Sequence, residues 1–143
     1  MKNRIIKHIG HFPLLIEKYR GDFPEGAIVL KLGEHRGANR GFGVLHILAE
    51  HAADLEKHSL TADETGVCAY VELILTTGAG IYSEFAALRG YHRPMVVYSR
   101  VGTVVLERQE IDGETVYSVV TAFARTSPRG VKIGSIPRQD KST

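Results

Sequence analysis

The sequence has a single cysteine, no tryptophan and no long hydrophobic run. Cys68 alone cannot form a disulfide within the chain, and no Cys/His spacing typical of a zinc site accompanies it. No apolar stretch reaches the roughly 18 residues that a membrane-spanning helix needs. The apolar residues near the N-terminus are interrupted by Lys7, His8, Gly10 and Pro13, which argues against a signal peptide. These absences predict a cytoplasmic protein with no metal, no cofactor and no contact with a membrane.

A strong excess of charge of one sign is also missing. Lys and Arg number 18 and Asp and Glu 16, so the net charge is only +2. This balance neither demands nor excludes nucleic acid, although a strong non-specific binder is usually more basic. The hydrophobic fraction of 43% in 143 residues is ordinary for a folded domain. Seven histidines are present, and their charge near neutral pH depends on their surroundings.

The chain is predicted to form one domain over residues 1–143 with three parts. These are an N-terminal helical segment (1–26), a core (27–125) and a basic tail (126–143). Within the first part, residues 14–20 follow Pro13 and precede Gly21, which is typical of a short helix.

The core begins with a predicted strand over residues 27–32, which is rich in aliphatic side chains and bounded by glycines. Residues 33–43 hold four glycines besides two arginines, which predicts a loop. A helix is expected over residues 44–57, because apolar residues recur there at steps of three and four. A second helix is expected from Thr61, whose spacing to Glu64 matches a capping box, to about residue 75.

The second half of the chain has the composition of a sheet. Residues 95–98, 103–109 and 115–125 are rich in Val, Tyr, Thr and Phe, and Asp112-Gly113 predicts a tight hairpin turn between the last two strands. A short strand is expected over residues 131–133. By the two-residue period, one face of the long last strand holds Tyr117, Val119, Thr121, Phe123 and Arg125. The sequence thus predicts an α+β fold in which N-terminal helices pack on a C-terminal antiparallel β-sheet.

The densest group of candidate functional residues lies on the helix over residues 44–57. His46 and Glu50 are four residues apart and therefore neighbours on one side of a helix. His51 lies about 140° around the axis from His46, so the two histidines are not expected to bind one metal ion. The spacing also differs from the HExxH pattern of zinc hydrolases. The alternative to a functional role is that the His46 ring packs at the edge of the core, with one nitrogen hydrogen-bonded to the backbone.

Arginines supply a second group of candidates. Arg36 and Arg40 precede the helix in the glycine-rich segment and could contact phosphates near its N-terminus, or they could belong to a solvated connection. On or beside the strands lie Arg100, Arg108, Thr121 and Arg125, which a sheet could aim at one phosphate. The alternative for each of these arginines is a solvated sheet edge.

Two short motifs resemble those of the barnase, EndoU, colicin and RelE-like nuclease superfamily, above all its phage-encoded and contact-dependent-toxin branches. The first is a Gly-then-His-Ile helix and the second is a Thr-Ala-aromatic tripeptide that ends the last long strand. The matching residues are Gly43, His46, Ile47 and His51, followed by Thr121, Ala122 and Phe123. The resemblance spans residues 27–125, and the segment 59–94 has no counterpart in it.

The resemblance implies metal-independent endoribonuclease activity through attack of a ribose 2′-hydroxyl on the adjacent phosphate, with transfer RNA as one candidate substrate. It implies a bacterial or phage toxin that acts in the cytoplasm of its host or of a target cell, delivered there within a larger protein in the second case. An acidic immunity protein or antitoxin is the expected partner. The implied catalytic residues are His46 and the weaker second histidine His51 for proton transfer, Arg100 for charge stabilisation and Thr121 as a hydroxyl donor, while Arg36, Arg40 and Arg125 bind RNA.

Two other functions are left open by the sequence. The chain could be a binding or accessory domain of a phage or secretion system that kept the fold and lost the chemistry. It could instead be an ADP-ribosyltransferase toxin, because residues 82–84 (Tyr-Ser-Glu) and 98–100 (Tyr-Ser-Arg) superficially resemble pieces of such sites. The sequence lacks the paired-glutamate ExE motif, which argues against this last alternative.

Overall fold

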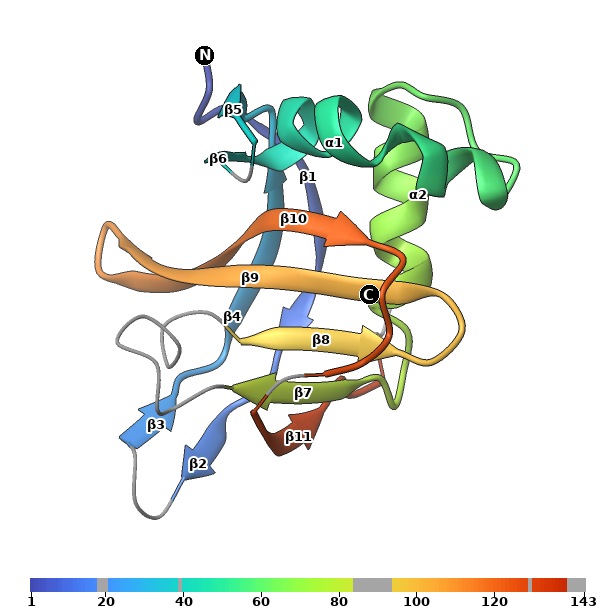
Figure 1. Ribbon diagram of the computed structural model, residues 1–143. Helices are drawn as coiled ribbons and strands as arrows, with labels where there is room; N and C mark the ends of the chain where they lie inside the picture. The colour runs from blue at the N-terminus through green and yellow to red at the C-terminus, as the bar shows by residue number, and fades with distance from the viewer. Residues whose placement is uncertain (18–20, 39, 84–93, 129, 139–143) are drawn as a thin grey trace.

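The computed structural model describes residues 1–17, 21–38, 40–83, 94–128 and 130–138. Its main feature is a seven-stranded sheet in the order β1-β4-β10-β9-β8-β7-β11 (Figure 1). β4 and β10 pair in parallel, whereas the other neighbours pair antiparallel. The strands are β1 (Ile5–Phe12), β4 (Gly26–Lys31), β7 (Gly80–Ser83), β8 (Met95–Tyr98), β9 (Gly102–Ile111), β10 (Glu114–Phe123) and β11 (Val131–Ser135).

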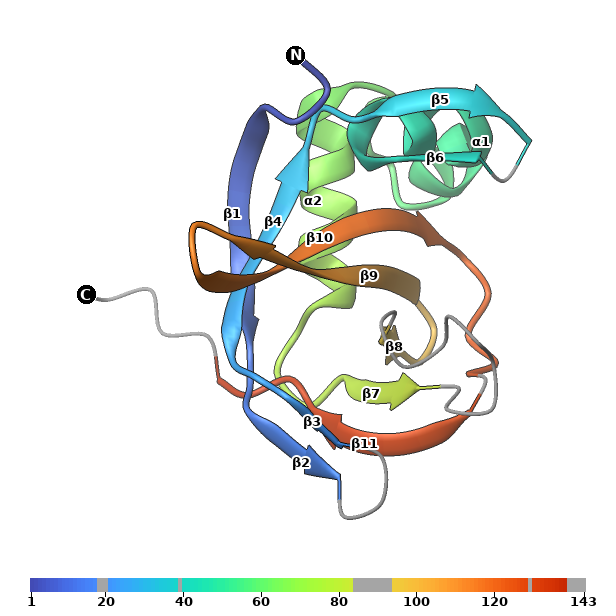
Figure 2. The same ribbon diagram turned by 90° about the vertical axis from the view of Figure 1, so that its left-hand side faces the viewer.

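Two small hairpins and two helices complete the described part of the chain. The hairpins are β2 (Leu15–Glu17) with β3 (Gly21–Phe23) and β5 (Glu34–Gly37) with β6 (Arg40–Phe42); the helices are α1 (Gly43–Lys57) and α2 (Glu64–Ile74). The sheet curls strongly, so that β11 at one edge approaches β2 (Figure 2). Among the described residues, no helix has the length and apolar character needed to cross a bilayer.

The predicted fold class is wrong, because the chain does not place N-terminal helices on a C-terminal sheet. Strands predominate, and the two helices lie in the middle of the chain between strands from both ends. The predicted N-terminal helical segment holds β1, and Leu15–Glu17 forms β2 where a helix was expected. The rest of that predicted helix, residues 18–20, lies outside the described residues.

Irregular pairing explains why β1 was missed. Its register with β4 shifts twice, between Ile5 and Lys7 and again between His8 and Gly10. Such bulges break the two-residue alternation by which a strand is recognised. The strand is nevertheless anchored in the core, since Phe12 is fully buried and its ring stacks on Tyr117 of β10 with centroids 3.9 Å apart.

The glycine-rich segment expected to be a loop is the β5–β6 hairpin, which leads directly into α1. Gly41 shows why glycine is needed there. Its φ is +142°, and a Cβ at this position would lie 2.2 Å from the carbonyl oxygen of Glu34. The glycines therefore allow the chain to double back tightly against the start of the helix.

Both predicted helices are confirmed, with one difference at the start of α2. Its N-cap is Asp63, which accepts a hydrogen bond from the backbone N–H of Gly66 at 2.8 Å. Thr61, the predicted cap, donates to the Asp63 carboxylate instead. Glycine is required at position 66, although it is a poor helix former, because a Cβ there would lie 1.7 Å from the Thr61 carbonyl oxygen.

The predicted β-hairpin of the second half is also confirmed as β9–β10, with Asp112 and Gly113 at positive φ in a two-residue turn. The expected short strand near residue 131 is β11, so the basic tail is not wholly outside the fold. Ile136 is buried, and its backbone exchanges hydrogen bonds of 2.8 Å with Gly78 and Ala79.

α1 lies over the end of β10, whereas α2 packs against α1 and against strands β1, β8 and β9 (Figure 1). Both helices contribute to one hydrophobic core with the sheet. The β5–β6 hairpin lies next to α1 on the same side of β10, and both contact that strand (Figure 1).

Candidate functional site

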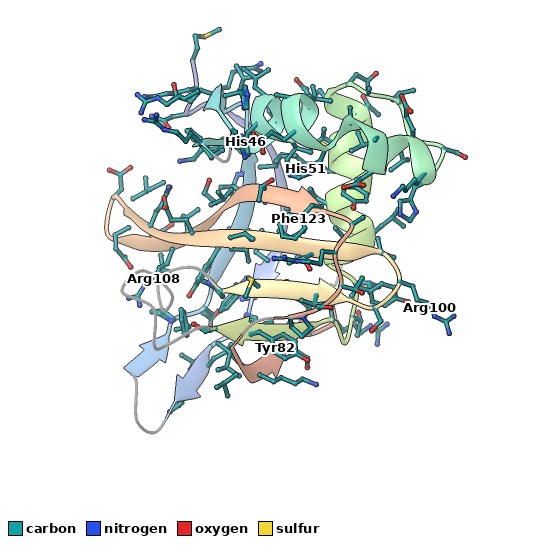
Figure 3. The ribbon with its side chains drawn as sticks, viewed as in Figure 1. His46, His51, Tyr82, Arg100, Arg108 and Phe123 are labelled. Atoms are coloured by element: carbon teal, nitrogen blue, oxygen red, sulfur yellow. The ribbon has the colours of Figure 1, made fainter. Side chains whose placement is uncertain are left out.

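An open cleft of about 730 Å³ lies between the β5–β6 hairpin, α1 and the sheet strands β9 and β10. It collects every candidate site residue expected from the sequence except Arg100 and Arg108. Figure 3 shows the positions of His46 and His51. The lining residues are Arg36, Arg40, Gly41, His46, Glu50, His51, Val105, Val120, Thr121, Phe123 and Arg125. Segments far apart in the sequence thus bring imidazole, guanidinium, carboxylate and hydroxyl groups to one place.

A β-bulge in β10 turns Thr121 and Phe123 toward this cleft. The pairing of β10 with β9 shifts between Val119 and Thr121. The predicted single face from Tyr117 to Arg125 is therefore wrong, because a bulge reverses the alternation beyond it. Tyr117 and Val119 are fully buried in the core, whereas beyond the bulge Thr121, Phe123 and Arg125 line the cleft.

A kink in α1 brings its two histidines to the same cleft. His51 has non-helical dihedral angles (φ −129°, ψ 23°), so the straight-helix expectation that His46 and His51 diverge does not hold. Asp54 lies beyond the kink and ties this part of α1 to the chain just after β10, because its carboxylate accepts the backbone N–H of Ala124 at 3.0 Å. The same Asp54 oxygen lies 3.7 Å from Nδ1 of His51 and helps to orient that ring.

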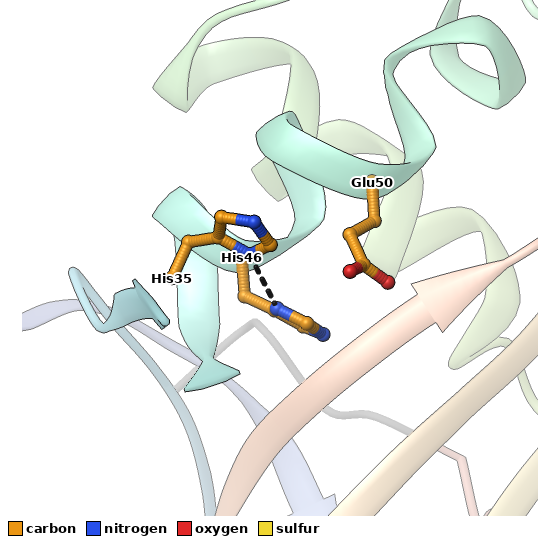
Figure 4. A group of neighbouring side chains, drawn as sticks. All are labelled: His35, His46 and Glu50. Carbon is orange, nitrogen blue, oxygen red and sulfur yellow. Dashed lines mark hydrogen bonds between the residues drawn. The ribbon is translucent and has the colours of Figure 1, made fainter. Parts of the chain in front are cut away.

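His46 is the most buried of the candidate residues, with 3% of its surface exposed. Its Nδ1 lies 3.2 Å from Nδ1 of the exposed His35 on β5, and its second ring nitrogen points away from His35 (Figure 4). Burial lowers the pKa of His46 below its ordinary value, and the neighbouring His35 and His51 act in the same direction, whereas Glu50 opposes them. The site thus favours a neutral imidazole, the form that can accept a proton.

The backbone beside His46 is shaped for this histidine pair. A Cβ on Gly41 would lie 3.0 Å from Nδ1 of His46 and 3.1 Å from the Cα of His35. Any larger residue at position 41 would therefore press on the contact between the two rings, in addition to the strain of its positive φ.

Three arginines surround the cleft. Arg36 lies on β5 with its Nε 3.1 Å from the Glu34 carboxylate, and Arg40 is exposed on β6. Arg125 follows β10, with its guanidinium 5.5 Å from the centre of the Phe123 ring. Three guanidinium groups thus lie around one cleft, in a chain whose net charge is only +2.

Thr121 lines the cleft and carries a polar group just beneath its wall. Its hydroxyl oxygen is buried and has no hydrogen-bond partner within the part of the chain that the structure describes. Buried hydroxyls are normally paired, so an unpaired one on the wall of a cleft marks a place where a ligand oxygen could bind. The sequence identified this residue through the Thr-Ala-aromatic tripeptide.

Arg100 lies elsewhere. It occupies the turn between β8 and β9 with a φ of +79°, is exposed, and lies well away from His46 and His51 in Figure 3. Arg108 likewise does not line the cleft; it lies on β9, where its Nε is 3.5 Å from the Glu110 carboxylate. Sequence reasoning placed these arginines on or beside strands correctly but could not say at which end or on which face of the sheet they lie.

Of the residues that superficially suggest an ADP-ribosyltransferase, those that the structure describes do not line the cleft either. Ser83 is fully buried, and Tyr98 and Arg100 lie at the exposed β8–β9 turn. Glu84 lies outside the described residues.

A smaller cavity of about 280 Å³ adjoins the cleft and shares Gly41 and Val120 with it. Its other lining residues are Lys2, Asn3, Phe42, Glu107, Gln109 and Ser118. The Ser118 hydroxyl, like that of Thr121, is buried without a hydrogen-bond partner among the described residues. The two cavities thus lie next to each other along β10, near its bulge.

Among the described residues, one group of three side chains could hold a metal ion. His35, His46 and Glu50 each offer a ligand atom, and these atoms lie within 4.8 Å of one another. Sequence reasoning noted Glu50 as a neighbour of His46 but missed His35. The β5–β6 hairpin brings His35 beside His46 from eleven positions away, a spacing that matches no common metal motif.

Comparisons with known proteins found no matching family model, no similar curated protein and no similar solved structure. The resemblance to the nuclease superfamily therefore stays a prediction that depends on two short motifs. Any assignment of function depends on the chemistry of the cleft itself.

Proposed function

We propose that this protein is an endoribonuclease that cleaves RNA without a metal ion. The observation that carries the proposal is the convergence of two histidines, a glutamate, an unpaired hydroxyl and three arginines in one open cleft. A group that accepts a proton, a group that donates one and positive charge for the phosphate are what RNA cleavage by an internal nucleophile requires.

In the proposed reaction, the ribose 2′-oxygen bonds to the adjacent phosphorus and the bond from phosphorus to the 5′-oxygen breaks. The products are a 2′,3′-cyclic phosphate and a free 5′-hydroxyl. His46 accepts the proton of the 2′-hydroxyl, because burial lowers the pKa of its ring and so favours the neutral form. His51 donates a proton to the leaving oxygen, and the Asp54 carboxylate 3.7 Å away offsets the positive charge of its protonated form.

Other side chains that line the cleft stabilise the phosphate in the proposed reaction. Arg125 takes the role that the sequence analysis gave to Arg100, since it lines the cleft and Arg100 does not. The Thr121 hydroxyl donates to a phosphate oxygen, which explains why it has no partner among the described residues. Arg36 and Arg40 hold the flanking phosphates, and the Phe123 ring offers a surface on which a base can stack.

The groove suits a single strand or an unpaired loop, whose bases can turn outward, and a transfer RNA loop is one such substrate. An enzyme of this kind in the cytoplasm would damage its own host, which is why we propose a toxin with an acidic protein inhibitor. The arginine-lined wall of the cleft is the surface that such an inhibitor would cover, by mimicry of RNA phosphates.

The test is RNA cleavage by paired variants of the purified protein. His46→Ala should lose about a hundredfold or more in rate, whereas His8→Ala, which changes an exposed histidine on β1, should not. Arg125→Gln should reduce cleavage and Arg100→Gln should leave it unchanged. RNA binding by the wild-type protein without any cleavage would instead support the alternative of a binding domain.

A further inference from the structure

The contact between His35 and His46 has a geometry that suits a metal ion as well as a hydrogen bond. The two Nδ1 atoms are 3.2 Å apart. Two imidazole nitrogens that bind one tetrahedral zinc ion at about 2.0 Å each lie about 3.3 Å from one another. Because the His35 side chain is exposed, its ring can rotate toward a point shared with His46.

A carboxylate supplies the third ligand. Glu50 lies one helical turn beyond His46 on α1, and one ligand atom from each of His35, His46 and Glu50 lies within 4.8 Å of the other two (Figure 4). Ligands of one zinc ion lie about 3.3 Å apart, so the carboxylate must move by about 1.5 Å at most, which rotation about the side-chain bonds of Glu50 can supply.

We propose that His35, His46 and Glu50 form a binding site for one divalent transition-metal ion, and that Zn²⁺ is the ion they suit best. Two imidazoles and one carboxylate are a ligand set that zinc accepts with a fourth position open. Magnesium and calcium prefer oxygen ligands and would bind poorly here.

The surroundings of the site support this assignment. His46 is buried with 3% of its surface exposed, so the fold positions its ring before an ion binds. Gly41 leaves room beside both rings that a side chain would fill. Arg36 opposes a cation but is paired with Glu34, and the positive charge of Arg40 and Arg125 favours an anion, such as a phosphate oxygen, in the open fourth position.

The site has a consequence for the proposed ribonuclease activity, and this part of the inference rests on that proposed function. The neutral His46 ring has one nitrogen lone pair, which can bind either a metal ion or the proton of the 2′-hydroxyl. A bound metal ion also places a positive charge beside the reacting phosphate. Metal binding and proton transfer at His46 therefore exclude one another. One equivalent of zinc should inhibit RNA cleavage, and a chelator should restore it.

Binding is tested directly, without reference to RNA. The full chain is freed of metal with EDTA, dialysed, and titrated with Zn²⁺ in a calorimeter, while Co²⁺ is used as a coloured probe of the coordination. We expect one ion per chain. His35→Gln and Glu50→Gln should each weaken binding by at least about tenfold, and the control His8→Gln should bind as the wild type does. Circular dichroism verifies that each variant is folded.

The result that would overturn the site is an absence of saturable binding at one ion per chain, or equal affinity in His35→Gln and the wild type. RNA cleavage is measured in a separate assay. No cleavage in EDTA would contradict the proposed function and leave the binding result standing. Cleavage that is unchanged with the site filled by zinc would overturn the proposed inhibition.

Discussion

Two buried tyrosines, Tyr70 and Tyr117, differ in whether their hydroxyl group has a hydrogen-bond partner. Tyr117 donates a hydrogen bond of 2.7 Å to the Pro24 carbonyl oxygen, whereas the buried Tyr70 hydroxyl has no partner among the described residues. Burial raises the pKa of Tyr70 to about 12. Both rings are fully buried, so the two tyrosines differ mainly in whether their oxygen is satisfied.

We therefore expect opposite effects from the same substitution at these two positions. Tyr70→Phe should leave the free energy of unfolding unchanged or raise it by up to about 1 kcal/mol, because an unsatisfied polar group is removed. Tyr117→Phe should lower it by about 1 kcal/mol, because the Pro24 carbonyl loses its donor. Urea unfolding of both variants measures the difference, and equal destabilisation by the two would show that the Tyr70 hydroxyl is satisfied in solution.

Thr121 should behave as a functional residue with little role in folding. Thr121→Val replaces an unpaired hydroxyl with a methyl group of similar size, so the stability should change by less than about 1 kcal/mol. Cleavage should fall by about tenfold or more, because a phosphate oxygen loses its donor. Ser118→Ala, which removes an unpaired hydroxyl from the smaller cavity, is the matched control for stability. Full activity in Thr121→Val would show that the Thr121 hydroxyl does not contribute to cleavage.

At the scale of whole elements, α1 is positioned by one carboxylate. Asp54 accepts the N–H of Ala124 just beyond β10 and lies beside His51. This one residue therefore joins the part of the helix beyond its kink to the strand that forms the floor of the cleft.

Two substitutions at Asp54 separate these roles. Asp54→Asn keeps an oxygen for the Ala124 N–H but loses the charge beside His51, so cleavage should fall while stability changes little. Asp54→Ala loses both, which should also cost about 1–3 kcal/mol, because the N–H is left without its partner. Thermal unfolding and cleavage rates measured together test this, and equal stability of the two variants would contradict the role of the hydrogen bond.

The elements also show how far the sequence could predict this structure. α1, α2 and the β9–β10 hairpin follow from regular apolar spacing, caps and an Asp-Gly turn, and they occur close to the expected bounds. β1 and the faces of β10 were wrongly predicted, because bulges set by pairing with distant strands interrupt the alternation. The candidate residues were found by type and motif, but the kink at His51 and the approach of His35 depend on tertiary contacts.

At the scale of the whole molecule, stability should depend on pH through His46. Its pKa is lowered in the folded protein below the ordinary value of 6.5, so near and below that pH the unfolded chain binds more protons at this residue than the folded chain does. Stability must then fall as the pH is lowered from about 7 to 5. The groups that act on His46 are Glu50, His35 and His51.

The corresponding measurement is urea unfolding at several pH values in EDTA, which keeps metal ions away from the histidines. The wild type should lose stability toward pH 5 more steeply than His46→Gln, because the variant lacks the buried titrating ring. The opposite order, with the variant more sensitive to acid, would show that His46 is preferentially protonated in the fold.

The central claim, that the cleft cleaves RNA by attack of the 2′-hydroxyl without a metal ion, is tested most directly by the chemistry of the cut ends. Total RNA is incubated with the wild-type protein in excess EDTA, and the new termini are mapped, with His46→Ala as the matched control. We expect the wild type to form 2′,3′-cyclic phosphate and 5′-hydroxyl termini and the variant to form neither. Termini with a 5′-phosphate, or cleavage that requires a divalent ion, would contradict it.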